Sequence, residues 1–199
     1  MLRKINFTIV FLICIVVSAK AQVVDYITHY GTESVFEGKQ LYDAGLVKNA
    51  EMKLIETVKQ FPDNPAGDRA VLLQAATDIE TGNYKLAEAN LTKFIQNRDN
   101  SPFRPYAALQ RAFATIETGR YEQAEYYFVD AQKYAEEEFE ARDDPRYRDI
   151  AHQSLYWHGI AMAEQGKYQD AQPVFQECVE NYPEGEYADD AYYALGQNA

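Results

Sequence analysis

Few residues of the kinds that build disulfide frameworks or metal centres occur in this sequence. Its 199 residues include two cysteines, three histidines and one tryptophan. A pair of cysteines allows one disulfide at most, so cross-links cannot substitute for a hydrophobic core. Stability must therefore come from packing of the apolar side chains, which make up 47% of the chain.

Basic residues are also scarce. The chain has 19 Lys and Arg against 31 Asp and Glu, a formal charge of −12, and no basic stripe. Nucleic-acid binding draws much of its affinity from cations that neutralise phosphates, so this composition excludes it and disfavours anionic lipid surfaces. The apolar content excludes a disordered chain, and Gly 10 with Pro 7 excludes a collagen-like one.

Long apolar runs are missing except at the N-terminus. Phe7 to Val17 is an apolar run of 11 residues, preceded by Arg3 and Lys4 and followed by Ala19-Lys20-Ala21. We expect residues 1–21 to be a signal peptide cleaved before Gln22. The alternative is a membrane anchor, but 11 helical residues rise only about 16 Å, roughly half of a bilayer core.

Cleavage would leave a mature chain with a charge of −15 and Cys178 as its single thiol. Cys14 follows Ile13 inside the apolar run, whereas lipid-bearing cysteines of bacterial lipoproteins follow a small residue. No run in the mature chain is long enough to span a membrane. We therefore expect an exported protein of the periplasm, with association at the outer membrane left open.

Four segments of the mature chain repeat one pattern. Each has a Gly, an apolar or aromatic residue two positions later, and an Ala three positions after that. The members are Gly45-Leu46-Val47 with Ala50, Gly82-Asn83-Tyr84 with Ala87, Gly119-Arg120-Tyr121 with Ala124, and Gly166-Lys167-Tyr168 with Ala171. Four residues beyond each Ala comes a large apolar side chain, namely Leu54, Leu91, Phe128 or Phe175, and the glycines are 37, 37 and 47 residues apart.

This pattern predicts pairs of helices. A helix ends at each Gly, which adopts the left-handed conformation at least cost, and a second helix follows whose Ala allows the first to cross closely. The predicted pairs are 33–44 with 47–60, 65–81 with 84–96, 105–118 with 121–141, and 146–165 with 168–181. An extended second helix in the third pair accounts for the spacing of 47.

Local signals agree with these boundaries. Asn64-Pro65, Ser101-Pro102 and Asp144-Pro145 each place a capping side chain before a proline at the start of a helix. Phe61-Pro62 and Tyr182-Pro183 end second helices. Pro173 lies about one turn into a predicted helix, so we expect that helix to start late or to bend.

The predicted fold class is all-α, a right-handed α-solenoid of antiparallel helix pairs. The expected divisions are a signal peptide (1–21), a lead-in segment (22–32), four repeats (33–62, 65–99, 102–142 and 145–183), and the first helix of an incomplete fifth repeat (185–199). The stretch Tyr187 to Gly196 reads as that helix, without a turn and second helix after it. We therefore expect further repeats C-terminal to this segment. The alternative is that this half-unit serves as a C-terminal cap.

The pattern resembles the tetratricopeptide repeat, or TPR. The fourth unit carries the resemblance best, with Leu155, Gly159, Gly166, Tyr168, Ala171, Phe175, Cys178 in place of a second Ala, and Pro183. The Tyr-Ala-x-x-Ala-x-Tyr-x-Leu-Gly motif is similar to the sequences of exported bacterial members of this family, including Tol-Pal-associated cell-division coordinators and long envelope repeat proteins. This resemblance implies a scaffold that binds proteins.

Residues that could carry catalysis are few and poorly placed. His152 and His158 are six apart on one predicted helix and so face different ways, while His29 lies in the lead-in segment. No nucleophile elbow, phosphate-binding loop, cysteine pair or His-Glu-x-x-His motif occurs. We expect no enzyme, no cofactor and no metal, and we interpret Glu136 to Glu138 as a solvated helix end.

A partner is expected on the concave side, which the resemblance assigns to the first helix of each pair. This first-helix wall consists of Arg69, Leu72, Leu73, Ala76, Tyr106, Leu109, Gln110, Phe113, Gln153, Tyr156 and Ile160. We select Arg69, Leu73, Tyr106, Gln110, Phe113 and Tyr156 as candidate partner-binding residues. The alternative is that half of the wall simply packs against neighbouring units.

Two functions compete at this stage. TPR proteins that hold the acidic tail of a chaperone use a cationic clamp, but the matching positions here are Val35, Lys39, Leu73, Tyr106 and Gln110, of which one is cationic. The wall favours an apolar helix or an extended segment of another envelope protein. The rival is a glycan-binding module of an outer-membrane polysaccharide-uptake system, which the 16 tyrosines invite.

Overall fold

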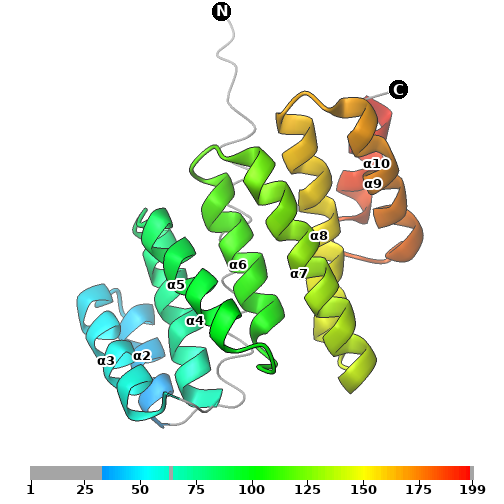
Figure 1. The fold of residues 1–199 in the computed structure, drawn as a ribbon. Coiled ribbons are helices and arrows are strands. Elements are labelled where there is room, and N and C mark those ends of the chain that lie inside the picture. Colours follow the sequence, from blue (N-terminus) through cyan, green and yellow to red (C-terminus); the bar gives the residue numbers. More distant parts are fainter. Residues whose placement is uncertain (1–32, 63–64, 198–199) are drawn as a thin grey trace, which may run out of the picture. The chain divides into compact units, whose positions relative to one another are not determined.

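The computed structural model describes residues 33–62 and 65–197, and its described parts form nine helices and no strand (Figure 1). The predicted leader (1–21), lead-in segment (22–32) and Asn64 cap lie outside the described residues. All eight helices of the predicted pairs begin and end within two residues of the expected positions. The described residues divide into two compact units, one up to Asn83 and one from Tyr84 onward.

The first unit contains helices α2 (Glu33–Asp43), α3 (Val47–Gln60) and α4 (Pro65–Glu80). Consecutive helices pack on each other, α2 on α3 and α3 on α4. The crossing of α2 and α3 is close because Gly38 has no side chain: a Cβ there would come within 2.8 Å of Leu54 Cδ2. Ala50 and Leu54 are fully buried at this crossing.

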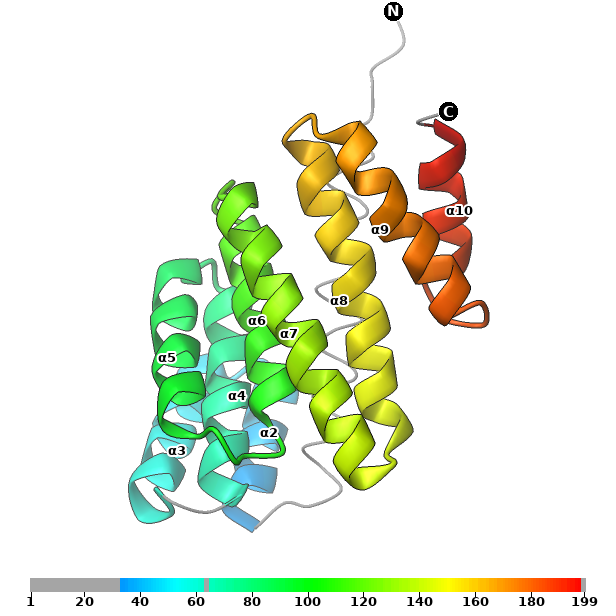
Figure 2. The same cartoon turned by 45° about the vertical axis from the view of Figure 1, so that its right-hand side comes forward.

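The second unit contains six helices, each packed on its neighbour in the sequence, and α6 also contacts α8 (Figure 2). They are α5 (Tyr84–Asn97), α6 (Arg104–Ile116), α7 (Tyr121–Arg142), α8 (Pro145–Glu164), α9 (Tyr168–Asn181) and α10 (Ala188–Gln197). Gly159 of α8 repeats the role of Gly38, since a Cβ there would lie 2.6 Å from the ring of Phe175 on α9. Helix pairs stacked in this way confirm an all-α solenoid.

The four turn glycines adopt the predicted left-handed backbone, with φ between 74° and 80°. After α2, the N–H of Gly45 donates to the carbonyl of Tyr42 and that of Leu46 to the carbonyl of Leu41. These two backbone hydrogen bonds together form a Schellman motif, and the same pair of bonds recurs at Gly82 and Gly166. No atom lies within 4 Å of a Cβ built on these glycines, so the positive φ alone requires them.

The repeat alanines and the large residues one turn later are buried positions of the second helices. Eight side chains are completely buried, at 0% exposure: Ala50, Leu54, Ala87, Leu91, Ala124, Phe128, Ala171 and Phe175. The small residue sets how near the two helices approach, and the large one fills the space beside it. The prediction that these positions are buried is confirmed.

One local prediction is confirmed, one was wrong, and the late start that was one of two expectations for α9 does not occur. Asp144 caps α8 as expected, because its side chain accepts the N–H of Arg146. Ser101 does not cap α6: its hydroxyl accepts the N–H of Phe103 in a preceding turn, and α6 begins at Arg104. Helix α9 begins at Tyr168 despite Pro173, which is exposed, so the ring and the unpaired carbonyl one turn earlier face solvent.

Arginines on α6 pack against tyrosines on α7. The guanidinium of Arg111 lies 3.7 Å from the ring centroid of Tyr127 and donates to Asp130 at 2.9 Å. Earlier on the same helix, Arg104 lies 3.8 Å above Tyr134. Stacking on an aromatic face lets a poorly hydrated guanidinium be buried at low cost, which explains how α6 carries cations although it is buried along most of its length.

Within the described ranges, no helix is long and apolar enough to cross a membrane.

Candidate functional site

The candidate partner-binding residues all lie on first helices, where the sequence placed them. Arg69 and Leu73 are on α4 of the first unit, while the other four are on α6 and α8 of the second. None is exposed by more than 6%, the values being 5% for Arg69, 0% for Leu73, 4% for Tyr106, 5% for Gln110, 6% for Phe113 and 3% for Tyr156. Of the eleven wall residues, only Ile160 is partly exposed.

Aromatic side chains join the first helices of the second unit. Phe113 meets Phe128 and Trp157 edge-on, with ring centroids 5.3 and 5.5 Å away. Tyr156 meets Trp157 edge-on at 5.5 Å and stacks on Tyr187 at 5.0 Å with an angle of 17°. Such contacts add to the burial of apolar area, so these rings hold α6, α7, α8 and the turn before α10 together.

Tyr106 belongs to a second aromatic group at the other end of α6. Its ring lies 6.4 Å from Phe103 and 6.1 Å from Tyr147. The Tyr147 hydroxyl donates to the carbonyl of Pro102 at 3.0 Å, which fixes the turn before α6 to α8. Tyr106 is thus part of the helix packing as well as of the predicted wall.

Two amide oxygens on the wall have no hydrogen-bond donor among the described residues. They are Oε1 of Gln110 on α6 and Oε1 of Gln153 on α8, and both are buried. The amide nitrogen of Gln153 does have a partner, since it donates to the Tyr187 hydroxyl at 2.8 Å. An acceptor left unsatisfied in an apolar environment is unfavourable, so a backbone N–H brought to these oxygens would bind well.

Of the two histidines in the described ranges, His152 is a buried packing residue. His152 stacks on Tyr182 with centroids 5.0 Å apart and lies edge-on to Tyr187 at 5.6 Å. Burial lowers its pKa to about 4, so the ring is neutral at pH 7. Burial also lowers the pKa of His158, against the opposing charge of Glu125. His29 lies outside the described residues.

Over the described residues, no three His, Cys, Asp or Glu side chains lie close enough together to hold a metal ion. The acidic run from Glu136 to Glu138 lies in the C-terminal half of α7, where Glu136 and Glu137 are exposed.

Three of the five positions that match the chaperone-tail clamp lie in the first unit, namely Val35, Lys39 and Leu73. Val35 is buried at 1% exposure, and Leu73 is fully buried. Lys39, the single cation of the set, is paired with Asp43 one turn further along α2, with 2.6 Å between Nζ and Oδ2. Its charge is therefore already engaged within its own helix.

Sequence reasoning missed exposed apolar residues on second helices. Met52 and Ile55 on α3, and Tyr126 and Val129 on α7, are between 39% and 72% exposed. The signal was present in the sequence, because these residues lie two and five positions after the repeat Ala and so on the opposite face of the helix. The predicted wall, in contrast, consists of first-helix residues only.

Comparison with known proteins agrees with this architecture. The family model described as "Tetratricopeptide repeat-like domain" matches residues 6–191, a range that begins inside the predicted leader. No curated protein matches the chain.

Two solved structures are similar to this chain. TTC0263, a thermophilic TPR protein in Thermus thermophilus, is 18% identical, with a TM-score of 0.50 over 83% of this chain and 79% of that one. A tetratricopeptide repeat protein from Parabacteroides merdae is 15% identical, with a TM-score of 0.44 over 83% of this chain and 73% of that one. Since the family model covers nearly the whole sequence, the chain belongs to the tetratricopeptide repeat-like domain family.

Proposed function

We propose that this chain is a non-enzymatic scaffold of the bacterial cell envelope, which binds a helix or an extended segment of a partner protein on its first-helix wall. The TPR-like fold suggests protein–protein interaction. The observation that carries the choice of surface is the pair of unpartnered amide oxygens, Gln110 Oε1 and Gln153 Oε1, among the aromatic rings of α6 and α8.

These oxygens give the wall a way to recognise main chain. The N–H groups of an extended segment are obligatory donors, and each needs an acceptor once it leaves water. Neighbouring rings of Tyr106, Phe113 and Tyr156 supply apolar contact for alternate side chains of such a segment. Because the wall residues are buried, we expect binding to require a local rearrangement of the wall side chains.

Replacement of Gln110 by Leu tests this proposal. The change removes an acceptor that has no partner, so the isolated fold should keep its stability or gain some. Binding should nevertheless fall, because a donor of the partner loses its acceptor. Leu73→Ala is the contrasting variant: it creates a cavity in a fully buried site and should lower stability by about 2 to 5 kcal/mol.

The measurement is affinity chromatography of an envelope extract on immobilised mature chain. A protein partner retained by the unaltered chain and lost with Gln110→Leu supports the scaffold. If the chain is retained on a polysaccharide column and no protein partner is found, the glycan-binding alternative replaces the scaffold hypothesis. If Gln110→Leu retains the partner as well as the unaltered chain does, the partner binds elsewhere and the amide oxygens are not part of the site.

The envelope location rests on the predicted leader. Export with cleavage before Gln22 would give a mature chain that begins at that residue and is recovered in the periplasmic fraction. N-terminal sequencing of the protein from fractionated cells tests this. A chain that retains residues 1–21 and sediments with membranes would instead show that the apolar run serves as an anchor.

A further inference from the structure

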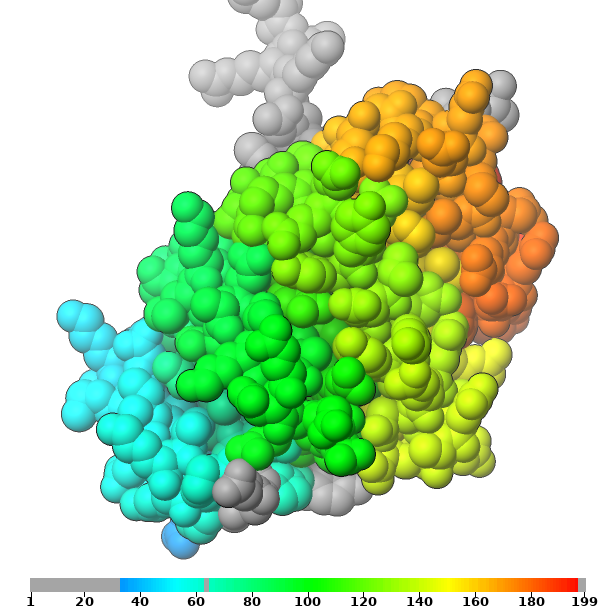
Figure 3. All heavy atoms as spheres, viewed as in Figure 1, coloured from blue at the N-terminus to red at the C-terminus, as the bar shows by residue number. Residues whose placement is uncertain are grey.

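Each second helix of the described chain has an exposed large apolar side chain, but only α3 and α7 carry a pair of them three residues apart. On α3 these are Met52, 72% exposed, and Ile55, 39% exposed. On α7 they are Tyr126 and Val129, at 64% and 44%. In Figure 3 the outer surface of α7 is uncovered along its length. Contiguous exposed apolar residues of this kind mark interaction sites more often than single ones do.

The repeat does not require apolar residues at these positions. The corresponding residues, two and five positions after the repeat Ala, are Ala89 and Thr92 on α5 and Pro173 and Gln176 on α9. Small or polar side chains therefore serve the same structural role there. The large apolar residues of α3 and α7 need another explanation, which a binding function supplies.

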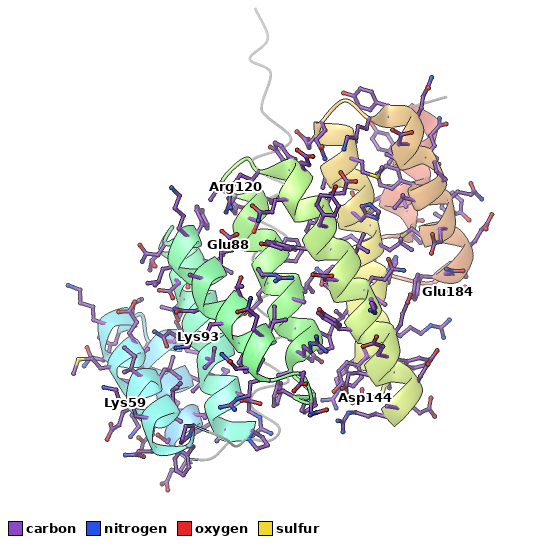
Figure 4. All side chains as sticks on the ribbon, viewed as in Figure 1. Lys59, Glu88, Lys93, Arg120, Asp144 and Glu184 are labelled. Atoms are coloured by element: carbon purple, nitrogen blue, oxygen red, sulfur yellow. The ribbon has the colours of Figure 1, made fainter. Side chains whose placement is uncertain are left out.

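The exposed face of α3 is flanked by cations. Lys48, Met52, Ile55 and Lys59 follow one another at intervals of four, three and four residues, so they form one line along the helix. We call these four residues the α3 stripe, and all four are exposed. Figure 4 shows Lys59 on α3. Helix α3 has three lysines and two glutamates, which makes it net positive in a strongly acidic chain.

The exposed face of α7 has the opposite charge. Glu122, Tyr126, Val129 and Lys133 repeat the same spacing, and the exposed Glu136, Glu137 and Glu140 continue the line. We call these seven residues the α7 stripe. Lys133 is paired with Glu137 at 3.9 Å, so the carboxylates dominate. Helix α7 as a whole carries seven acidic and two basic residues.

We propose that the α3 stripe of one copy docks on the α7 stripe of a second copy. Apolar pairs of equal spacing would meet, Met52 and Ile55 against Tyr126 and Val129, and charges of opposite sign would lie at both ends. This contact uses the outer helix faces, so it is independent of the first-helix wall.

The charge spacing fits in either relative direction of the two helices. Each lysine of the α3 stripe lies about 8 Å along the axis from the centre of its apolar pair. Glu122 lies about 8 Å from the centre of the Tyr126–Val129 pair, and Glu136 and Glu137 lie about 13 Å away on the other side. One lysine therefore faces Glu122. The other lies opposite Lys133, whose charge is offset by Glu137, and reaches Glu136 and Glu137 with its flexible side chain.

Such a contact joins different surfaces of two copies, so each copy retains an unused α3 or α7 stripe. Contacts of this kind produce rings or open chains of molecules rather than closed dimers. Four apolar side chains bury far less area than a stable interface does, so the association should be weak. We expect the average mass to rise with concentration and to fall as salt screens the charges.

Sedimentation velocity over a range of concentrations and salt tests the proposal. Lys48→Glu with Lys59→Glu should weaken self-association at least about tenfold, since attractive pairs become repulsive. Glu122→Lys, Glu136→Lys and Glu137→Lys together should do the same. Mixing the two variants should restore association, because each altered stripe then meets an oppositely charged one on the other variant.

Lys85→Glu with Lys93→Glu is the matched control. It makes the same charge change on exposed residues of α5, which has no apolar stripe, and should leave association unchanged. Thermal unfolding checks that all variants remain folded. The proposal is overturned if the unaltered chain stays monomeric throughout, if the mixture does not associate, or if the control weakens association equally. Binding to anionic vesicles without self-association would also overturn it, in favour of a lipid surface.

Discussion

The guanidinium of Arg120, in the turn before α7, binds both carboxylate oxygens of Glu88 on α5 (Figure 4). In the next helix pair along the chain, Lys167, in the turn before α9, binds Glu125 on α7 with 3.1 Å between Nζ and Oε2. In both cases the cation lies between the turn Gly and the aromatic residue, and the carboxylate follows the repeat Ala of the preceding pair. Ion pairs therefore link consecutive second helices of the second unit at the repeat interval.

Replacement of Arg120 by Ala should lower the free energy of unfolding by about 1 to 2 kcal/mol. The Glu88 side chain is 13% exposed, so removal of its partner leaves a poorly solvated charge. Urea unfolding measures the change. A double-mutant cycle with Glu88→Gln isolates the pair, and it should show that the second change costs little once the first is made.

Lys133→Ala is the control for a surface pair. Lys133 and Glu137 are 68% and 55% exposed and 3.9 Å apart, so their separation should cost less than about 0.5 kcal/mol. Equal losses for Arg120→Ala and Lys133→Ala would show that burial of Glu88 has no role.

Gly159→Ala should lower stability by about 1 to 3 kcal/mol. The new Cβ would lie 2.6 Å from the ring of Phe175, so α8 and α9 would have to separate or the ring would have to move. Thermal or urea unfolding measures the loss. The second change Phe175→Leu should not restore it, since a Cβ at the corresponding Gly38 would still lie 2.8 Å from Leu54 Cδ2.

Gly196→Ala supplies the comparison, because no described atom lies within 4 Å of a Cβ at that position on α10. Ala favours a helix over Gly by about 0.5 to 1 kcal/mol, so stability should be unchanged or slightly higher. If both alanines destabilise alike, helix crossing does not explain Gly159.

The sequence predicted helix boundaries and turn glycines well because both depend on local chemistry. Gly82, for example, adopts the left-handed conformation that ends a helix, and this conformation depends only on residues within about one turn. Ser101 misled because a serine before a proline can cap a helix or close a turn. The buried ring of Phe103 favours the turn here, and Pro105 lies in the first turn of α6 instead.

The candidate site was predicted less completely, since burial depends on distant neighbours. The sequence assigned Tyr106, Phe113 and Tyr156 to first helices, but it could not show that each contacts an aromatic ring elsewhere in the second unit. The unpartnered oxygen of Gln110 was likewise invisible, because a hydrogen-bond partner can lie anywhere in the chain.

His152 should make stability depend on pH. Its folded-state pKa is lowered to about 4, while the unfolded value is 6.5. Between these pH values the imidazole is protonated in the unfolded chain and neutral in the folded chain. The contribution is fully present above pH 6.5 and is lost as the pH falls towards 4, by up to about 3 kcal/mol. Urea unfolding at several pH values should show this slope in the unaltered chain and not in His152→Gln.

The comparison with His152→Gln is needed because carboxyl groups act in the opposite direction. Burial raises the pKa of Asp149 and of Asp190, so protonation of these groups favours the folded state as the pH falls. Their effects are common to both proteins and cancel in the difference. A difference that stays constant between pH 7 and 4.5 would show that His152 titrates normally in the folded chain.

Cys178 should be unreactive until the chain unfolds. Its side chain is completely buried on α9, and burial raises the pKa of the thiol to about 12. At pH 8 only about one thiol in ten thousand is ionised, and the thiolate is the species that reacts. Labelling with a disulfide reagent should therefore be slow in buffer and fast in urea, whereas Gln176→Cys in a Cys178→Ala background should react at once, because position 176 is exposed. Rapid labelling of native Cys178 would contradict the packing of α9, and two reactive thiols per unfolded chain would show that Cys14, and with it the leader, is retained.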